Sequence, residues 1–250
     1  MNLLLKDKVA VITGSSQGIG AGIAKAFASQ GARVVINYRS NHRKADQLVD
    51  EIIEHGGKAI AIRADISEPS DIAQLFETTI EVFGRLDILV NNTGILEFEV
   101  LDAITPENLQ AQIDTNLIGT ILCTQKAAAL MIKEGGSIIN ISATTSINPL
   151  PGTLVFSATK AAIDNITKVL SKELGPRNIR INTIAPGMTE TEGSHEKGMM
   201  GSVFEQQNIS LTPLGRIAQP EDIAKVAVFL ASDDAAWVTG ERIQVSGGQL

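Results

Sequence analysis

Short apolar runs alternate with longer amphipathic stretches along nearly the whole chain. Each run is a few residues long, as in a strand of a parallel sheet that is buried on both faces. The stretches between the runs repeat apolar residues every three to four positions, which is typical of helices packed on a sheet. The predicted strands cover residues 9–12, 34–36, 59–62, 87–90, 137–141, 180–184 and 242–245. The predicted helices cover residues 19–30, 43–55, 70–83, 106–132 (bent near Gly119), 154–174 and 220–231.

The order of these elements predicts the fold class. Seven strands alternating with six helices indicate an α/β fold, a single-domain Rossmann-type doubly wound parallel sheet flanked by helices. A (β/α)₈ barrel is the alternative, but it needs one more strand–helix unit. No Gly/Ser/Pro-rich linker divides the chain, so we expect residues 1–250 to form one domain. The one long irregular stretch, residues 188–214, is expected to be a lid or substrate-binding loop.

Composition narrows the classes of partner and compartment. The chain carries 21 Lys and Arg against 28 Asp and Glu, a net charge of −7, which argues against nucleic acid as a partner. No apolar run approaches the ~18 residues of a membrane helix and no targeting segment is visible, so we expect a cytoplasmic protein without membrane association. The single cysteine, Cys123, excludes an internal disulfide, and the three histidines lack metal-ligand spacing, so no metal site is predicted.

A glycine-rich segment follows the first predicted strand and opens the first helix. Residues 13–20 read Thr-Gly-Ser-Ser-Gln-Gly-Ile-Gly. Glycines at such a turn let the backbone approach a pyrophosphate, whose charge is met by the helix N-terminus. The spacing Gly-x₃-Gly-x-Gly differs from the common Gly-x-Gly-x-x-Gly fingerprint and resembles the pattern of the short-chain dehydrogenase/reductases.

Further segments carry the same resemblance. Asp65 and Ile66 follow the third predicted strand, and residues 91–94 read Asn-Asn-Thr-Gly where the family usually has Asn-Asn-Ala-Gly. Asn116 lies in the long fourth helix, and a Pro-Gly pair ends the sixth strand. The resemblance extends over residues 8–248. Within the family, the chain resembles the branch of 3-oxoacyl-carrier-protein reductases and glucose dehydrogenases.

The resemblance implies a nicotinamide cofactor, a small-molecule carbonyl or alcohol substrate, and a homotetramer. In the family the glycine loop holds the cofactor's diphosphate, and later segments border its adenine, ribose and carboxamide. The cofactor-binding positions carried over to this sequence are Gly14, Ser16, Gln17, Gly18, Ile19, Gly20, Arg39, Ser40, Asp65, Ile66, Asn92, Gly94, Lys160, Pro186, Gly187 and Thr189.

The end of the second predicted strand bears on the choice between NADP(H) and NAD(H). An acidic residue there would bond the ribose 2′-hydroxyl and repel a 2′-phosphate. Residues 37–41 instead read Asn-Tyr-Arg-Ser-Asn, so Arg39 is placed to pair with a phosphate dianion. We therefore predict NADP(H) over NAD(H). Dual use stays open, because some NADP-selective relatives carry a second basic residue where this chain has Gln17.

The catalytic positions depart from the family pattern. The family uses Asn, Ser, Tyr and Lys, with the Tyr and Lys one helical turn apart. The corresponding segment here runs from Phe156 to Lys160, and the position thirteen residues before the phenylalanine, where the family serine stands, is Ala143. Asn116 and Lys160 remain. Ser142 is one residue out of register, which turns a side chain on a strand to the opposite face.

The loss of two hydroxyl groups predicts severely impaired catalysis. A positioned acid–base group contributes about 10²–10⁴-fold and an oxyanion donor about 10²–10³-fold, without simple additivity. Tyr→Phe and Ser→Ala each delete one oxygen from an otherwise intact site, which favours an active-site knock-out form of a carbonyl reductase. The alternative is a natural NADP(H)-binding homologue that reduces an imine or serves as a non-redox scaffold.

Overall fold

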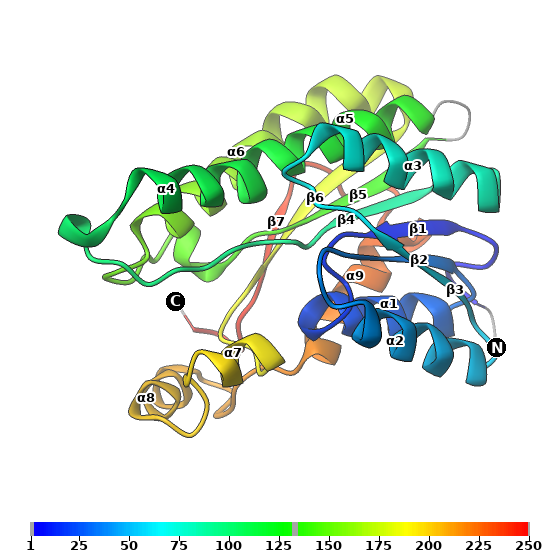
Figure 1. The fold of residues 1–250 in the computed structure, drawn as a ribbon. Helices are drawn as coiled ribbons and strands as arrows, with labels where there is room; N and C mark the ends of the chain where they lie inside the picture. Colours follow the sequence, from blue (N-terminus) through cyan, green and yellow to red (C-terminus); the bar gives the residue numbers. More distant parts are fainter. Residues whose placement is uncertain (1–2, 132–134, 250) are drawn as a thin grey trace.

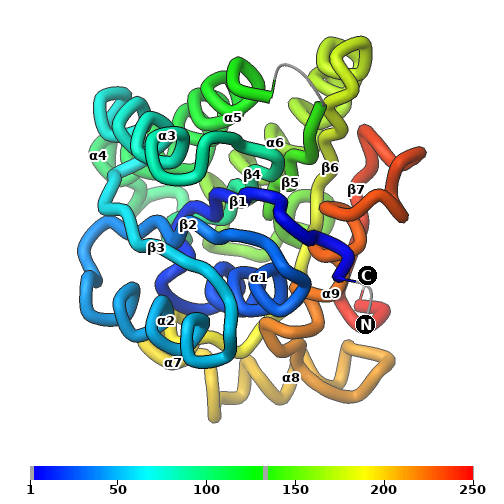
Figure 2. The backbone as a smooth tube through the Cα atoms, turned by 90° about the vertical axis from the view of Figure 1, so that its right-hand side faces the viewer, coloured from blue at the N-terminus to red at the C-terminus, as the bar shows by residue number. Residues whose placement is uncertain are grey.

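A seven-stranded parallel sheet forms the centre of the computed structural model, which describes residues 3–131 and 135–249 (Figure 1). The strand order is β3-β2-β1-β4-β5-β6-β7, and Figure 2 shows it running across the molecule. The strands are β1 (Val9–Ile12), β2 (Arg33–Tyr38), β3 (Lys58–Arg63), β4 (Ile88–Asn91), β5 (Gly136–Ile141), β6 (Ile179–Pro186) and β7 (Arg242–Val245). The predicted doubly wound α/β fold is confirmed, and the barrel alternative is excluded because the sheet is open.

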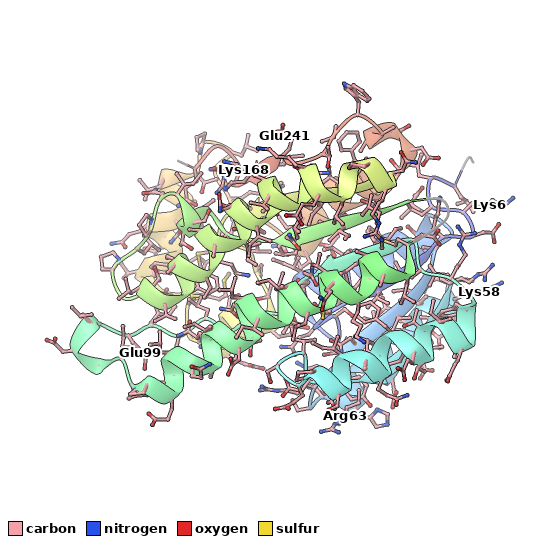
Figure 3. The ribbon with its side chains drawn as sticks, turned by 90° about the horizontal axis from the view of Figure 1, so that it is seen from above. Lys6, Lys58, Arg63, Glu99, Lys168 and Glu241 are labelled. Atoms are coloured by element: carbon pink, nitrogen blue, oxygen red, sulfur yellow. The ribbon has the colours of Figure 1, made fainter. Side chains whose placement is uncertain are left out.

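Helices cover both faces of the sheet (Figures 1 and 2). One face carries α1 (Gly18–Ser29), α2 (His42–Glu54) and α9 (Pro220–Ala231). The other carries α3 (Pro69–Phe83), α4 (Pro106–Ile113), α5 (Gly119–Leu130) and α6 (Leu154–Leu174), and Figure 3 shows α3, α5 and α6 side by side. This arrangement explains the apolar runs, since Ile12 of β1 packs in the same core cluster as Phe27 of α1, while Val11 packs with Phe76 of α3 on the opposite face.

The chain changes direction across the sheet at β1, which lies between β2 and β4. Ligands of open α/β sheets bind in the crevice at such a switch point, beyond the carboxyl ends of the strands. Here the segment after β1 lies against the segment after β4, because the Thr13 hydroxyl accepts hydrogen bonds from the backbone N–H groups of Asn92 and Thr93. The glycine loop and the Asn-Asn-Thr-Gly segment therefore lie side by side at the crevice where ligands of such sheets bind.

The long fourth helix is interrupted by a π-helical segment, Asp114–Ile118, between α4 and α5. The bend predicted near Gly119 lies at the end of this segment, and the predicted end at Ile132 lies outside the described residues. π-turns inside helices are rare and frequent at functional sites, and this one contains Asn116.

The stretch 188–214 is not irregular, so that prediction was wrong in detail. It contains the short helices α7 (Glu192–Glu196) and α8 (Val203–Leu211). Each begins with a capping side chain, Thr191 or Ser202, that accepts a hydrogen bond from a backbone N–H three residues on. We call residues 188–214 the lid, after the role expected of them from the sequence; both helices lie beyond the carboxyl ends of β6 and β7 (Figure 1).

Candidate functional site

The glycine loop between β1 and α1 is held against the segment after β4. Gly14 and Gly18 have φ of +59°, a conformation that side chains rarely adopt. A Cβ on Gly20 would lie 2.5 Å from Nδ2 of Asn92, and this Nδ2 itself donates to the carbonyls of Thr13 and Gly14. The loop therefore needs glycine where the sequence has it, and its backbone is fixed by Asn92.

The N-terminus of α1 receives a carboxylate from the lid. Gln17, the N-cap residue, makes no side-chain capping bond. Instead the backbone N–H of Gly18 donates to Oε2 of Glu192 at 2.9 Å. Thr191 packs against the same glycine, since a Cβ on Gly18 would lie 3.3 Å from Cγ2 of Thr191. Neither lid residue is among the predicted cofactor-binding residues; the Thr-x-x-Ser capping pattern was the available signal for Thr191.

Two cationic side chains follow the end of β2, and one of them, Lys44, reaches the glycine loop. The guanidinium of Arg39 is 61% exposed and lies 3.8 Å from the carboxylate of Asp65. Lys44, in the first turn of α2, donates from Nζ to Oε1 of Gln17 at 2.6 Å. Ser40 is exposed in the turn between them. Lys44 was not predicted, although the basic run at residues 42–44 was the signal that could have found it.

The side chain of Tyr38 belongs to this end of the site. Its ring stacks on His42 with centroids 5.4 Å apart, and its hydroxyl is 2.9 Å from Nδ1 of that histidine. The one tyrosine of the chain is thus engaged on α2 rather than beside Lys160.

Lys160 and Asn116 both lie beside Gly94. Lys160 is 5% exposed and donates from Nζ to the carbonyl of Ile141 at 2.8 Å. Burial lowers the pKa of Lys160 to about 8, against an opposing effect of the Asp164 carboxylate. Asn116 accepts from the N–H of Ile95 at 2.7 Å and donates to its carbonyl at 2.9 Å. A Cβ on Gly94 would lie 3.2 Å from Nζ of Lys160 and 3.5 Å from Oδ1 of Asn116.

The two positions that lack a hydroxyl lie next to Lys160. Phe156 precedes it by one turn of α6, and Nζ of the lysine is 5.4 Å from the phenyl centroid. Ala143 follows β5 with extended backbone. The neighbouring Ser142 donates its hydroxyl to the carbonyl of Lys160 at 3.2 Å, so this group is used on α6. The hydroxyl of Thr145 is buried and has no hydrogen-bond partner among the described residues.

A cavity of about 390 Å³ joins these groups. The predicted residues that line it are Ile19, Asn92, Gly94, Ala143, Phe156, Lys160, Pro186, Gly187 and Thr189. The rest of its lining combines hydroxyl and amide side chains and Lys197 with apolar side chains, among them Leu96, Phe98, Leu150, Met188, Met199 and Phe204. The remaining predicted residues do not line it: Gly14, Ser16, Gln17, Gly18 and Gly20 lie in the glycine loop, Arg39, Ser40, Asp65 and Ile66 beyond β2 and β3, and Asn116 behind Gly94.

Two contacts fasten the lid to the segment after β4. The rings of Phe98 and Phe204 meet edge to face with centroids 6.5 Å apart. Nζ of Lys197 lies 3.1 Å from Oε2 of Glu97. Such an exposed ion pair contributes little stability, so the aromatic pair is the stronger of the two contacts.

Glu99 is labelled in Figure 3, at the end of the molecule away from Lys58, the first residue of β3.

We also searched the described residues for metal-binding clusters, membrane-spanning helices and a reactive cysteine. Within residues 3–131 and 135–249, no cluster of three or more His, Cys, Asp or Glu side chains is arranged to hold a metal ion. No helix in these ranges is long and apolar enough to cross a membrane. Cys123 is buried in α5, and burial raises the pKa of its thiol to about 12, so it is a packing residue.

Comparisons with known proteins cover essentially the whole chain. A family model described as enoyl-(acyl carrier protein) reductase matches residues 14–249. The chain is 50% identical over 244 residues to an uncharacterized oxidoreductase of Methylorubrum extorquens, with 98% of each covered. It is 40% identical over 248 residues to a 3-oxoacyl-[acyl-carrier-protein] reductase of Synechocystis sp., again with 98% of each covered.

A solved structure is similar in both fold and sequence. It is a 7α-hydroxysteroid dehydrogenase in complex with NADH and 7-oxo glycochenodeoxycholic acid. The TM-score is 0.95 at 36% identity, with 100% of this chain and 96% of that chain covered.

Proposed function

Since the chain belongs to the short-chain dehydrogenase/reductase family and is an oxidoreductase of the kind that acts on carbonyl and alcohol groups, we propose that it uses NADP(H) and that its own turnover is low. The cofactor assignment depends on the end of β2, and the low turnover depends on Phe156 and Ala143.

The observation that carries the cofactor assignment is the pair of cations that follows β2. Lys44 reaches Gln17 of the glycine loop from α2, and Arg39 lies at the end of β2 beside Asp65. The segment between them, residues 40–43, contains no carboxylate. A 2′-phosphate dianion matches two such cations, whereas a ribose 2′-hydroxyl is best met by a carboxylate. The similar 7α-hydroxysteroid dehydrogenase was solved with NADH, so the proposed preference for NADP(H) rests on these residues of this chain.

The remaining residues fit a dinucleotide. Gly20 lets the glycine loop pack closely against Asn92, and the N-terminus of α1 already attracts an anion, the carboxylate of Glu192. In this assignment the glycine loop holds the diphosphate, Asp65 and Ile66 border the adenine, and Pro186, Gly187 and Thr189 hold the carboxamide. Once bound, the nicotinamide supplies or accepts a hydride.

Low turnover follows from the groups that face the substrate. The two positions that should carry a phenol and a serine hydroxyl present only carbon, while Asn116 and Lys160 are in place. Each missing group accounts for a loss of about 10²-fold or more. The intact remainder of the site favours a knock-out form. Imine reduction or a scaffold role is the second candidate, since a cationic imine needs no proton donor.

The cavity supports a small apolar carbonyl compound as substrate. Its wall is formed by aliphatic, aromatic and thioether side chains, and Asn92, Asn148 and several threonines supply the polar contacts. An isothermal titration of the chain with NADPH and NADH tests the proposal. We expect NADPH to bind at least tenfold more tightly; equal binding would overturn the NADP(H) assignment.

We also propose a cytoplasmic homotetramer. Ile121 and Leu130 on α5 and Leu154 and Val169 on α6 expose apolar side chains on one helical layer. Light scattering coupled to size exclusion tests it: a mass four times that of the 26.5 kDa chain is expected, and a monomer would contradict it.

A further inference from the structure

The charged side chains that line the cavity are all cationic. Among the described residues of its lining, the ionisable groups are two lysines, Lys160 and Lys197, and neither aspartate nor glutamate is present. The rest of the lining is uncharged, and much of it is apolar. A cleft lined by one sign of charge, with walls of low dielectric constant, attracts ligands of the opposite sign. The cavity therefore favours a ligand with a negative charge.

The two lysines belong to different parts of the site. Lys160 is 5% exposed, donates to the carbonyl of Ile141 and is among the residues assigned to the cofactor. Lys197 follows α7 in the lid, with 36% of its side chain exposed. It belongs to none of the segments assigned to the cofactor, so its charge is the one that a substrate can use.

The two ends of α7 face different regions of the site. At the N-terminal end, Glu192 accepts a hydrogen bond from the glycine loop, to which the diphosphate is assigned. At the C-terminal end, ~7 Å further along the helix, Nζ of Lys197 lies 3.1 Å from Oε2 of Glu97. The residues on either side of this glutamate, Leu96 and Phe98, both line the cavity. Lys197 thus lies at the end of α7 that is away from the glycine loop, beside apolar residues of the substrate region.

The pairing with Glu97 leaves the ammonium of Lys197 able to change partners. Both side chains are partly exposed, at 36% and 46%, and such pairs contribute little stability. Glu97 itself does not line the cavity. Because the lysine ammonium stands on a flexible four-carbon stem, it can exchange the carboxylate of Glu97 for one that enters the cavity. The entering anion then gains a charge-assisted hydrogen bond.

We propose that the substrate combines an apolar body with a carboxylate, and that Lys197 binds this carboxylate. The inference rests on the proposed reductase function and adds the class of substrate to it, a keto acid or the corresponding hydroxy acid. The apolar lining receives the body of the molecule, the carbonyl reaches Phe156 and Ala143, and the carboxylate stays at the lid.

Binding of matched acids and esters tests the proposal without any turnover. The probes are 3-benzoylpropionate and 4-benzoylbutyrate, two aryl keto acids with spacers of different length, and their methyl esters. The unmodified chain is titrated first with NADP⁺ and then, as the NADP⁺ complex, with each probe by isothermal calorimetry. We expect the acid with the better-fitting spacer to bind at least threefold more tightly than its ester. Added salt should reduce this difference, because the lysine is partly exposed.

Variants of the ion pair separate substrate binding from lid fastening. We expect Lys197→Met to weaken acid binding at least threefold and to leave ester binding within twofold, while Lys197→Arg keeps the affinity for the acid. Glu97→Gln removes the competing carboxylate, so it should strengthen acid binding about two- to threefold. The matched control is Lys25→Met, which removes the lysine of another exposed pair, Lys25–Glu51, outside the cavity lining. It should bind both probes as the parent does.

Steady-state kinetics in the Phe156→Tyr/Ala143→Ser background give a second readout. Lys197→Met should raise KM for the acid at least threefold and leave kcat within twofold, because the lysine binds a group other than the reacting carbonyl. The KM for the ester should not change.

Three results overturn the inference: equal binding of acid and ester by the parent, no binding of either acid, or equal losses for acid and ester in both Lys197→Met and Glu97→Gln. The last would mean that the ion pair only fastens the lid. Each of them leaves the cofactor assignment standing, because NADP⁺ binding is measured first. Failure to bind NADP⁺ would overturn the proposed function together with the inference.

Discussion

Glu192 of the lid accepts a 2.9 Å hydrogen bond from the backbone N–H of Gly18, in the first turn of α1. The carboxylate lies at the positive end of the helix, where the glycine loop would receive the cofactor's diphosphate. A closed lid and a bound diphosphate therefore bring like charges to the same helix end.

Replacing this carboxylate should strengthen cofactor binding. We expect Glu192→Gln to lower the Kd for NADPH about two- to fivefold, because the negative charge at the helix end is removed. Fluorescence titration with NADPH measures it, with the exposed Glu196→Gln on the same helix as control. Weaker binding by Glu192→Gln would show that the carboxylate holds the lid closed over the cofactor instead.

The cations at the end of β2 should set the choice of cofactor. We expect Arg39→Gln with Lys44→Met to weaken NADPH binding at least tenfold and to leave NADH binding unchanged, since only NADPH carries the 2′-phosphate. Titrations with 2′,5′-ADP and 5′-AMP isolate this group. Lys58→Met, at the far end of the molecule from the labelled Glu99 (Figure 3), is the control. An equal loss for both nucleotides would contradict the assignment.

The Phe98–Phe204 contact should hold the lid. Phe204→Ala removes an aromatic pair worth about 0.5–1.5 kcal/mol, so we expect proteolysis within residues 188–214 to accelerate about two- to tenfold. Phe229→Ala, at an exposed phenylalanine of α9, should leave the cleavage rate unchanged. Equal rates for all three chains would mean that other contacts close the lid.

Acid stability should depend on Asp222. Its hydrogen bond from Arg216 and a backbone bond from Gln219 lower the pKa of this carboxyl from 3.8 to about 2. A carboxyl whose pKa is lowered on folding stabilises the protein above its ordinary pKa, and this contribution is lost as pH falls through the folded value. Because the pair is partly exposed, we expect Asp222→Asn to lower Tm by only a few degrees at pH 6. The difference should vanish near pH 2, and the exposed Asp50→Asn should show neither effect.

The strands of the central sheet were predictable because a parallel strand that is buried on both faces consists of consecutive apolar residues, as at Val9–Ile12. The lid helices were not, since α7 has only five residues and owes its start to the cap at Thr191 rather than to periodicity. The π-helical segment around Asn116 was not predicted; the sequence indicated only a bend near Gly119.

Site residues that belong to a local sequence motif were predictable. Site residues that only tertiary contacts bring to the site were less so. Lys44 and Glu192 reach the glycine loop from α2 and from the lid, 27 and 174 residues away from their partners Gln17 and Gly18. The basic run at residues 42–44 marks Lys44 as a candidate cation, but no local pattern predicts that it contacts Gln17. Strand geometry predicts that the side chain of Ser142 turns away from the catalytic face. Its hydroxyl bonds the carbonyl of Lys160, but the residue also lines the cavity.

We propose that this protein is an NADP(H)-dependent carbonyl reductase whose turnover is limited by two absent hydroxyl groups. The most direct measurement is the NADPH-dependent turnover of Phe156→Tyr/Ala143→Ser on a panel of apolar ketones, beside the parent and the control Phe229→Tyr. We expect kcat to rise by about 10²-fold or more in the double variant and not in the control. A double variant that binds NADPH yet reduces no ketone of the panel would contradict the claim.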